Sequence, residues 1–379
     1  MNATVTDVPN QAGTAETIFL DHAGIAPLSG PAAAAMANYA RHSQRQGYLD
    51  ADWYARIESV RAAAARLVHA RSPDEIAFVA NTSTGLATVA EGLPWRSGDN
   101  VVITGVEYPA NRYPWENLRR RDVKVIEVAP LPDGRIDVED VCDAVTDRTR
   151  AVAISHVQYA SGYRIDLRPI ADMVHEAGGY LCVDAIQSLG AMPFDVQADA
   201  IDFAAADGHK WLLGPEGCGL LYCREDLVQL LHPPVIGWMC MVDHVDYGNY
   251  RFELAENCRR FEPGSYNVAG VLALGASIDM LAEIGAETIW SRIEALTDRI
   301  ATGVCEKGYT IYSPRMDPSE RSGMVVFEPP DDGPGRSAIV RDLQRRRIVI
   351  VEREGRLRAS PHFYNTEAQI DRFLEALPG

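Results

Sequence analysis

A chain of 379 residues can hold two domains, and its 47% hydrophobic content is ordinary for a globular enzyme. The formal net charge of −17 argues against nucleic acid and anionic membrane surfaces as partners, because both would repel the chain. Seven cysteines without a C-x-x-C pair favour reduced thiols over a disulfide frame or a zinc site. With no apolar run near the roughly 18 residues of a membrane helix, we expect a cytoplasmic protein without a metal centre.

Residues 1–17 are polar and lack the basic flank and apolar core of a secretory signal, so we expect a flexible tail. A short extended segment at 18–24 and two helices, from Pro31 and over 53–70, come next. Seven strands separated mostly by helices then follow at 76–80, 101–105, 124–128, 151–155, 180–183, 202–206 and 219–223. This α/β pattern predicts a mostly parallel, seven-stranded sheet with helices on both faces, in a large domain of residues 18–265.

The alternation of strands and helices stops after about Pro263. Beyond it we expect helices at 268–284 and 289–307, strands near 324–327 and 348–351, and a final helix at 367–377. These elements predict a smaller α+β domain of residues 266–379 at the C-terminus, with the N-terminal segment of the large domain packing near it.

Lys210 stands between a buried strand rich in small residues, 201–207, and a turn rich in glycine and proline, 214–219. Parallel α/β sheets bind ligands at such strand ends. The chain has only three lysines against a large excess of arginine. Arginine cannot lose its proton in a protein, whereas a desolvated lysine can, and it then forms a Schiff base. An ordinary half-buried lysine is the alternative.

Two further features could converge with this lysine. Asn81-Thr82-Ser83-Thr84-Gly85 follows a strand and opens a helix, where hydroxyls and free backbone amides suit a phosphate. Asp184 ends another strand, where a buried carboxylate is costly without a cationic partner such as a protonated heteroaromatic nitrogen. A simple N-cap explains one hydroxyl of the first motif, and helix capping is also an alternative for Asp184.

Arg358 lies on an extended segment before a proline and could clamp a substrate carboxylate with two hydrogen bonds. Arg356 shares its strand face and competes for that role. Tyr108, in the turn Glu107-Tyr108-Pro109-Ala110-Asn111, could stack on a flat ring or simply pack. A phosphate cradle, a carboxylate for a ring nitrogen and an imine-forming lysine together describe a pyridoxal phosphate site.

From about Phe19 to the C-terminus the chain resembles the class V aminotransferase-like enzymes of the fold-type I pyridoxal phosphate group. That group includes cysteine desulfurases, selenocysteine lyases, kynureninases and isopenicillin N epimerases. The motifs that carry the resemblance are Leu-Asp-His-Ala, Asn-Thr-Ser-Thr-Gly, Glu-Tyr-Pro-Ala-Asn, Val-Asp-Ala-Ile-Gln, Asp-Gly-His-Lys-Trp and Arg-Ala-Ser-Pro-His-Phe-Tyr-Asn. The resemblance implies that Lys210 binds the cofactor and shuttles protons, that Asp184 keeps the ring nitrogen protonated and that Gln187 contacts the ring hydroxyl.

The same resemblance assigns the cofactor phosphate to Thr82, Ser83 and His209. It implies that Tyr108 stacks on the cofactor ring and that Arg358 binds the substrate carboxylate.

Members of the family are homodimers in which the neighbouring subunit completes the phosphate site. This nominates Ser265, within Phe-Glu-Pro-Gly-Ser-Tyr-Asn, and Trp238 in a second crossing segment. Asp207 stands where a serine often helps to hold the phosphate. A carboxylate there would repel the phosphate, so we expect Asp207 to face away.

Two departures from the family bear on the reaction. Desulfurases use a loop cysteine shortly before the carboxylate-binding arginine as sulfur acceptor, but the last cysteine here is Cys305 and residues 345–355 contain none. We therefore predict against persulfide chemistry of that kind. Tyr108 and Pro109 replace the histidine that usually stacks on the ring in desulfurases, a pattern closer to kynureninase-like and epimerase-like members.

For the reaction we predict an enzyme that handles an α-amino acid as an external aldimine, by β-elimination at the C–S bond of a cysteine-derived substrate. This needs only Lys210 and a donor to the departing sulfur. Epimerisation needs a second base, for which His22 and His156 are candidates; transamination and decarboxylation are further alternatives. A non-catalytic binding protein of this fold would be expected to lose Lys210 or Asp184, and the glycine spacing at 214–219 does not fit a dinucleotide enzyme. The arginine- and alanine-rich composition suggests a GC-rich bacterial genome, a source that specialised metabolism would suit.

Overall fold

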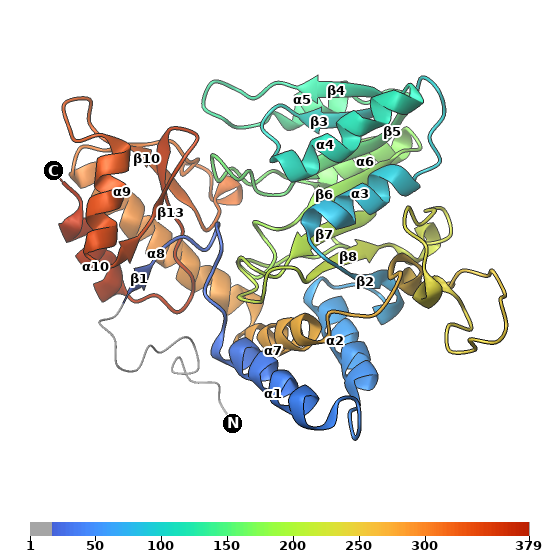
Figure 1. Cartoon of the computed structure of the whole chain (residues 1–379). Coiled ribbons are helices and arrows are strands. Elements are labelled where there is room, and N and C mark those ends of the chain that lie inside the picture. Colours follow the sequence, from blue (N-terminus) through green and yellow to red (C-terminus); the bar gives the residue numbers. More distant parts are fainter. Residues whose placement is uncertain (1–16, 379) are drawn as a thin grey trace.

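The computed structural model describes residues 17–378. All but the last residue of the expected tail, 1–17, lies outside the described residues. Figure 1 shows a large unit built on the central sheet and a smaller unit, orange to red, formed by the C-terminal third of the chain. The first strand of the described chain lies against the smaller unit.

The large unit contains the seven-stranded sheet, in the order β2-β8-β7-β6-β5-β3-β4. Its strands are β2 (Ile76–Val79), β3 (Asn100–Thr104), β4 (Lys124–Val128), β5 (Thr149–Ser155), β6 (Tyr180–Asp184), β7 (Phe203–Asp207) and β8 (Gly219–Cys223). β8 is antiparallel to both of its neighbours, and the remaining pairs are parallel. The predicted α/β class and mostly parallel sheet are confirmed.

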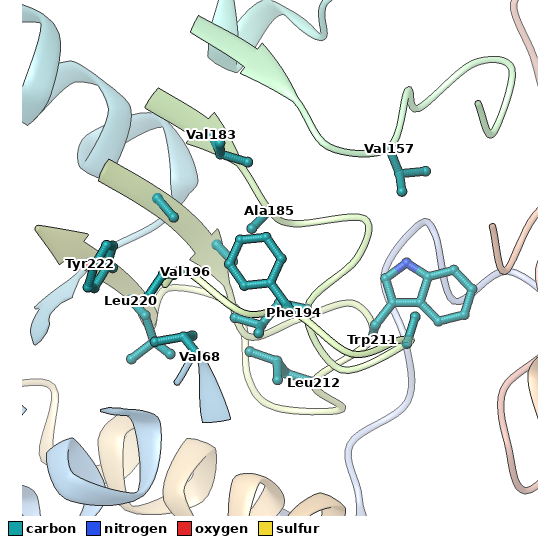
Figure 2. Close-up of a cluster of buried hydrophobic side chains, with 14 of the residues drawn as sticks. Val68, Val157, Val183, Ala185, Phe194, Val196, Trp211, Leu212, Leu220 and Tyr222 are labelled. Carbon is teal, nitrogen blue, oxygen red and sulfur yellow. The ribbon is translucent and has the colours of Figure 1, made fainter. Parts of the chain in front are cut away.

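Helices cover both faces of this sheet. α3 (Thr82–Gly92) and α4 (Tyr113–Glu116) pack on one face, and α2 (Trp53–Leu67), α5 (Val138–Asp143), α6 (Arg168–Glu176) and α7 (Val268–Ile284) pack on the other. Successive residues of a strand point to opposite faces. In β7, Phe203 and Ala205 therefore belong to the apolar core on the face of α3 and α4, the first core. Ala204 belongs to the core on the opposite face, the second core. Figure 2 shows part of the second core, where Phe194 lies by the ends of the strands and Trp211 lies farther out, among the loops.

The smaller unit is an antiparallel sheet of four strands with helices packed on it. The order β12-β13-β10-β9 consists of β12 (Val351–Arg353), β13 (Arg356–Ala359), β10 (Val325–Glu328) and β9 (Thr310–Ile311). Its helices are α8 (Ala286–Glu306), α9 (Arg336–Arg345) and α10 (Glu367–Ala376). Sequence reasoning missed α9, because only Ile339 and Leu343 of this arginine-rich helix are buried and its apolar periodicity is weak.

A two-stranded parallel pair links the chain's start to this smaller unit. β1 (Ile18–Phe19) pairs with β11 (Ile348–Val349), and its Ile18 belongs to the apolar core of the smaller unit. The division at residue 266 stays a prediction. The helix just after it, α7, packs against α1 (Gly30–Gln46) and α2 of the large unit, whereas α8 packs on the small sheet.

The remaining elements are short 3-10 helices: η2 (Pro73–Glu75), η3 (Pro109–Asn111), η4 (Asn117–Arg121), η5 (Glu225–Leu227), η6 (Trp238–Cys240), η7 (Cys258–Phe261) and η8 (Pro318–Glu320). Among residues 17–378, no single helix has the length and apolar character to cross a membrane. The pair α7 and α8, bent by 81°, passes that test only in combination, by length and composition.

Candidate active site

A cavity of about 290 Å³ lies where β6 and β7 end, between the large sheet and the hairpin of β12 and β13. Eight of the residues expected in the site line it: Thr82, Ser83, Tyr108, Asp184, Gln187, His209, Lys210 and Arg358. Carboxyl ends of neighbouring parallel strands meet at one edge of a sheet, which is why motifs far apart in sequence converge here. Other lining residues, such as Ile25, Tyr159 and Arg353, had not been expected.

Lys210 enters the cavity from the turn that follows β7. Burial is the main cause that lowers the pKa of its amine to about 8; the cations Arg358 and Arg353 lower it further, and Asp184 opposes them. Near pH 8 a substantial fraction of the amine is therefore neutral. A neutral amine can attack an aldehyde and accept a proton, so the environment favours the imine chemistry predicted for this residue.

Asp184, the last residue of β6, lines the same cavity as Lys210, and the charges of the two side chains interact. Its Oδ1 accepts a hydrogen bond from the Ile186 N–H at 3.1 Å. Burial raises the pKa of this carboxyl to about 7, with the Ile186 hydrogen bond and Lys210 acting against the rise and Glu107 adding to it. A buried acid of this kind gains from a cationic partner, and a protonated ring nitrogen would be one.

The N-terminus of α3 forms another part of the cavity wall. Asn81 caps the helix by accepting from the Thr84 N–H at 2.9 Å, and the Thr82 hydroxyl accepts from the Asp207 N–H at 2.9 Å. Gly85 allows α3 to lie close on β7, because a Cβ at this position would stand 2.7 Å from that of Ala205. Free amides and the exposed Ser83 hydroxyl at a helix start suit a phosphate.

Asp207, which we expected to face away, is one of the residues that line the cavity. Its two carboxylate oxygens have local partners. Oδ1 accepts from the Gly208 N–H at 2.7 Å, and Oδ2 lies 2.9 Å from His209 Nδ1, off the line of a good hydrogen bond. Both oxygens of Asp207 are therefore directed at neighbouring polar groups of the same turn.

Gln187 is held in one orientation by two hydrogen bonds. Its Nε2 donates to the carbonyl of Ala23 at 3.0 Å, and its Oε1 accepts from Trp211 Nε1 at 2.9 Å. An amide nitrogen carries two hydrogens, so one of them is left for an oxygen of a ligand in the cavity. This position is compatible with the contact to the ring hydroxyl that the family resemblance implies.

Tyr108 lines the cavity beside Lys210. Lys210 Nζ lies 5.7 Å from the centre of its ring, and Tyr159 packs edge-on against it with the ring centres 5.1 Å apart. The Tyr108 side chain is 43% exposed, so one ring face is available to a flat ligand. Tyr159 belongs to the wall because the chain turns back there after β5.

Arg358, on β13, lies in the cavity wall, and its side chain is 2% exposed. It donates to the carbonyl of Tyr159 at 2.9 Å and to Asp21 at 3.0 Å, and its Nε has no hydrogen-bond partner among the described residues. Arg356 turns elsewhere: it stacks on Tyr312 at 3.6 Å and pairs with Glu328 at 2.7 Å. Of the two competing arginines, Arg358 is thus the one in the cavity.

Arg353 is a second arginine in the cavity that sequence reasoning missed. It lies opposite Arg356 across the hairpin of β12 and β13, and Val351 lies opposite Arg358, so the three arginines share one face of the hairpin. Two of them have carboxylate partners, whereas Arg353 has no ion pair and its Nε is unpartnered within residues 17–378. Its strand could have been recognised from the Glu354-Gly355 turn signal.

Two predicted site residues do not join the cavity of their own chain. Trp238, in η6, is 41% exposed and lines a separate hollow beside His244 and Tyr247. Ser265 is exposed just before α7. Their roles, which the resemblance places across a subunit interface, stay predictions.

The two histidines considered as a second base do not line the cavity either. His22 is hydrogen-bonded by both ring nitrogens, to the carbonyl of Ser360 at 2.8 Å and the hydroxyl of Tyr364 at 2.6 Å. Burial lowers the pKa of His156 to about 3, assisted by Arg164. Both histidines are structural in this geometry. In the described part of the chain, no group of three or more His, Cys, Asp or Glu residues could hold a metal ion.

The residues present fit pyridoxal phosphate. A buried amine of lowered pKa, a buried carboxyl of raised pKa and a helix N-terminus surround one cavity, and these are the three groups that an aldehyde, a ring nitrogen and a phosphate require. The fold and this constellation define a fold-type I pyridoxal phosphate enzyme.

Residues 18–373 match the family model described as aminotransferase class-V, and the chain belongs to this family. It is 33% identical over 381 residues to a probable cysteine desulfurase of Methanothermobacter thermautotrophicus, covering 95% of this chain and 94% of that protein. The predicted family and cofactor are thereby confirmed.

Two solved structures are similar over nearly the whole chain. The apo structure of a cysteine desulfurase from Thermococcus onnurineus NA1 has a TM-score of 0.84 at 28% identity, covering 95% of this chain and 93% of that one. The complex of the cystine C–S lyase C-DES with cysteine persulfide has a TM-score of 0.88 at 24% identity, covering 98% and 100%, and supports the fold alone.

Proposed function

We propose that this enzyme cleaves the C–S bond of a cysteine-derived amino acid by β-elimination and releases the sulfur to solvent. The observation that carries the proposal is the lack of a thiol at the cavity: none of the seven cysteines, all within the described residues, lines it. Relatives such as the probable cysteine desulfurase of M. thermautotrophicus support a sulfur-containing substrate. A desulfurase transfers sulfur to a thiol, so a site without one favours release.

Arginines of the hairpin hold the substrate carboxylate. Arg358 is fixed by Asp21 and Tyr159 and still has its Nε–H to donate, and Arg353 adds a positive charge that no carboxylate of the described chain neutralises. A carboxylate that accepts from a guanidinium forms strong, directional hydrogen bonds. This anchoring leaves the amino group and Cα of the substrate near Lys210.

Lys210 moves the proton. With a pKa lowered to about 8, its amine is sufficiently neutral to take the Cα proton and hold it as an ammonium. Pyridoxal phosphate, when bound, supplies the electron sink for the negative charge that develops at Cα. Asp184 maintains the proton on the ring nitrogen that makes the sink effective.

The reaction balances with water as the only other reactant and needs no oxidant. The Cα–H and Cβ–S bonds break, the electrons of the C–H bond form the Cα–Cβ double bond, and the sulfur leaves as a thiolate that takes up one proton. Hydrolysis of the resulting enamine gives pyruvate and ammonia. Tyr108, in the cavity wall beside Lys210, is the side chain that we assign as proton donor to the sulfur.

We further propose a cytoplasmic homodimer that acts on a free amino acid. The stretch around η6 exposes large apolar side chains, the group Val235, Ile236, Trp238, Val242, Val245, Tyr247, Tyr250 and Phe252. Figure 1 shows this segment, in yellow, extending from the edge of the large unit. A patch of this kind marks a protein interface, which supports Trp238 and Ser265 as contributions to the neighbouring subunit's phosphate site.

Product analysis tests the reaction. S-substituted cysteines and plain amino acids are incubated in deuterated water, and pyruvate, thiol, ammonia and Cα deuterium are quantified by mass spectrometry. We expect equimolar pyruvate, ammonia and thiol from the S-substituted cysteines. Deuterium exchange at Cα without loss of the thiol would favour epimerisation, and pyruvate from alanine with an aminated cofactor would favour transamination; either outcome alone contradicts the proposal.

A further inference from the structure

Glu107, the third residue after β3, is a buried carboxylate beside the cofactor site, 6% exposed. It accepts hydrogen bonds from Thr104 Oγ1 at 2.8 Å, Asn111 Nδ2 at 2.9 Å, Ser155 Oγ at 2.5 Å, the Ser155 N–H at 3.1 Å and Gln158 Nε2 at 3.0 Å. So many donors surround the two oxygens that this group is built to be an acceptor, as an ionised carboxylate is.

All of these donors are neutral. Within residues 17–378, no lysine, arginine or histidine lies at ion-pair distance from Glu107. A carboxylate removed from water without a cation is expensive, even when it is well hydrogen-bonded. A glutamine would fill the same space at lower cost, so the charge itself requires an explanation.

The carboxylate of Glu107 is next to Asp184 in the sheet. Ser155, which gives Glu107 both its N–H and its hydroxyl, is the register partner of Asp184 in the pairing of β5 with β6. Neighbouring strands lie about 4.8 Å apart. Glu107 thus caps the end of β5 one strand away from the acid that faces the cofactor ring, on the side away from Lys210.

The charged groups that act on Asp184 are few. Lys210 lowers its pKa and Glu107 raises it, in addition to the larger effect of burial. His156, whose N–H donates to the Asp184 carbonyl, is neutral because burial lowers its pKa to about 3. Cys182, on the same strand, is a thiol whose pKa burial raises. Glu107 therefore contributes the negative charge on this side of the site.

We propose that Glu107 is a positioning residue for the cofactor's proton: its buried negative charge behind Asp184 keeps a proton bound between Asp184 and the ring nitrogen of pyridoxal phosphate. A second negative charge near Asp184 disfavours loss of the proton that Asp184 and the ring nitrogen share. That proton is therefore retained to higher pH. This inference rests on the proposed role of Asp184, and the experiment separates the two.

The test is a pH titration of Glu107→Gln and of wild type, each prepared as two isotope-labelled samples. In the apo protein, ¹³C NMR of labelled aspartate follows the carboxyl of Asp184; in the holoenzyme, ¹⁵N NMR of ring-labelled pyridoxal phosphate follows the ring nitrogen. We expect both midpoints to fall by about one pH unit in Glu107→Gln, a tenfold loss of proton affinity. Glu107→Asp, which keeps the charge, should return both midpoints toward wild type.

Glu75→Gln is the matched control. Glu75 is also fully buried, and it accepts from the backbone N–H groups of Arg71 and Glu225 without an ion pair, but it lies at the start of β2, outside the cavity. This variant should leave both midpoints in place. Unchanged midpoints in Glu107→Gln, or an equal shift in Glu75→Gln, would overturn the proposal.

Two further measurements keep the outcomes distinct. If Glu107→Gln does not fold, the ¹³C signal of labelled Glu107 in wild type decides: an ionised carboxylate at pH 8 supports the proposal, and a protonated one overturns it. Asp184→Asn tests the proposed role of Asp184 separately. A ring nitrogen that stays protonated in that variant refutes the role of Asp184, whereas the apo titration still measures the effect of Glu107 on its neighbour.

Discussion

Arg353 and Arg356 offer a paired test of how the site recognises its substrate. Both side chains lie on the same face of the β12–β13 hairpin, but only Arg353 lines the cavity, and Arg356 is occupied by Glu328 and Tyr312. Replacing each by glutamine removes one positive charge from nearly the same place in the fold. We expect a loss of substrate recognition in Arg353→Gln alone.

The size of the effect follows from electrostatics. Two unit charges about 6 Å apart interact by about 2.8 kcal/mol at an effective dielectric constant near 20. Arg353 is only half-buried, so solvent screening reduces this to about 1.4 kcal/mol, which corresponds to about tenfold in kcat/KM. Because Arg353 also lowers the pKa of Lys210, its removal should raise that pKa and move the rising limb of the pH profile to higher pH.

The assay compares an S-substituted cysteine with the matching S-substituted cysteamine, which has no carboxylate. For Arg353→Gln we expect a higher KM with the amino acid. The rate at which the amine of the cysteamine replaces Lys210 on the cofactor should change little. Arg356→Gln should behave as wild type with both compounds. Equal losses with the two compounds, or equal losses in the two variants, would refute the assignment of Arg353 to the substrate carboxylate.

Three other substitutions and one titration probe the same framework. Lys210→Ala should still bind pyridoxal phosphate at the α3 N-terminus but show no turnover and no covalent trapping of the cofactor by borohydride; retained turnover would exclude it as the proton carrier. In the apo protein, the rate at which Lys210 captures an aldehyde should rise with pH to a midpoint near 8, because its pKa is lowered to about 8, and a midpoint near 10.5 would contradict the burial argument. Arg358→Ala should reduce kcat/KM by an amount that corresponds to about 2–5 kcal/mol of lost transition-state stabilisation, as expected when one partner of a buried charge pair is lost. An unchanged kcat/KM would exclude the contact. Glu262→Gln should lower the free energy of unfolding by about 1.5–3 kcal/mol, since it removes the buried partner that Arg61 holds at 2.6 Å and leaves the partly exposed Glu58, at 3.2 Å, as counter-ion; urea denaturation measures this, and a loss below about 1 kcal/mol would be inconsistent.

Sequence reasoning located the residues at strand ends well. Lys210, Asp184 and Thr82 each follow or end a short apolar strand, and the parallel order of those strands brings their carboxyl ends to one edge. Local patterns of apolar residues and turns contain this information. Arg353 was missed because its place depends on the register of an antiparallel hairpin, and Arg356, two residues from Arg358, looked equivalent until its stacking on another chain segment was known.

Other features could not be read from sequence for different physical reasons. The acid neighbouring Asp184 became visible only through the pairing of β5 with β6, which places Ser155 of one strand beside the last residue of the next. The histidines were ambiguous because hydrogen-bonded and catalytic histidines have the same sequence signature; only burial and partners separated them. The roles predicted for Ser265 and Trp238 involve a second subunit, so the geometry of one chain does not test them.

The pairing of β1 with β11 links the cavity wall to the smaller unit through a short run of chain. Ile18 and Leu20 belong to the core of the smaller unit, and Asp21 pairs with Arg358, whereas residues 23–25 form part of the cavity wall. Any tilt of the small sheet would therefore displace residues 23–25 and change the width of the cavity entrance. Shortening the protein from its N-terminal end past residue 18 should therefore alter how quickly products escape, while the ring-binding end of the pocket keeps its shape.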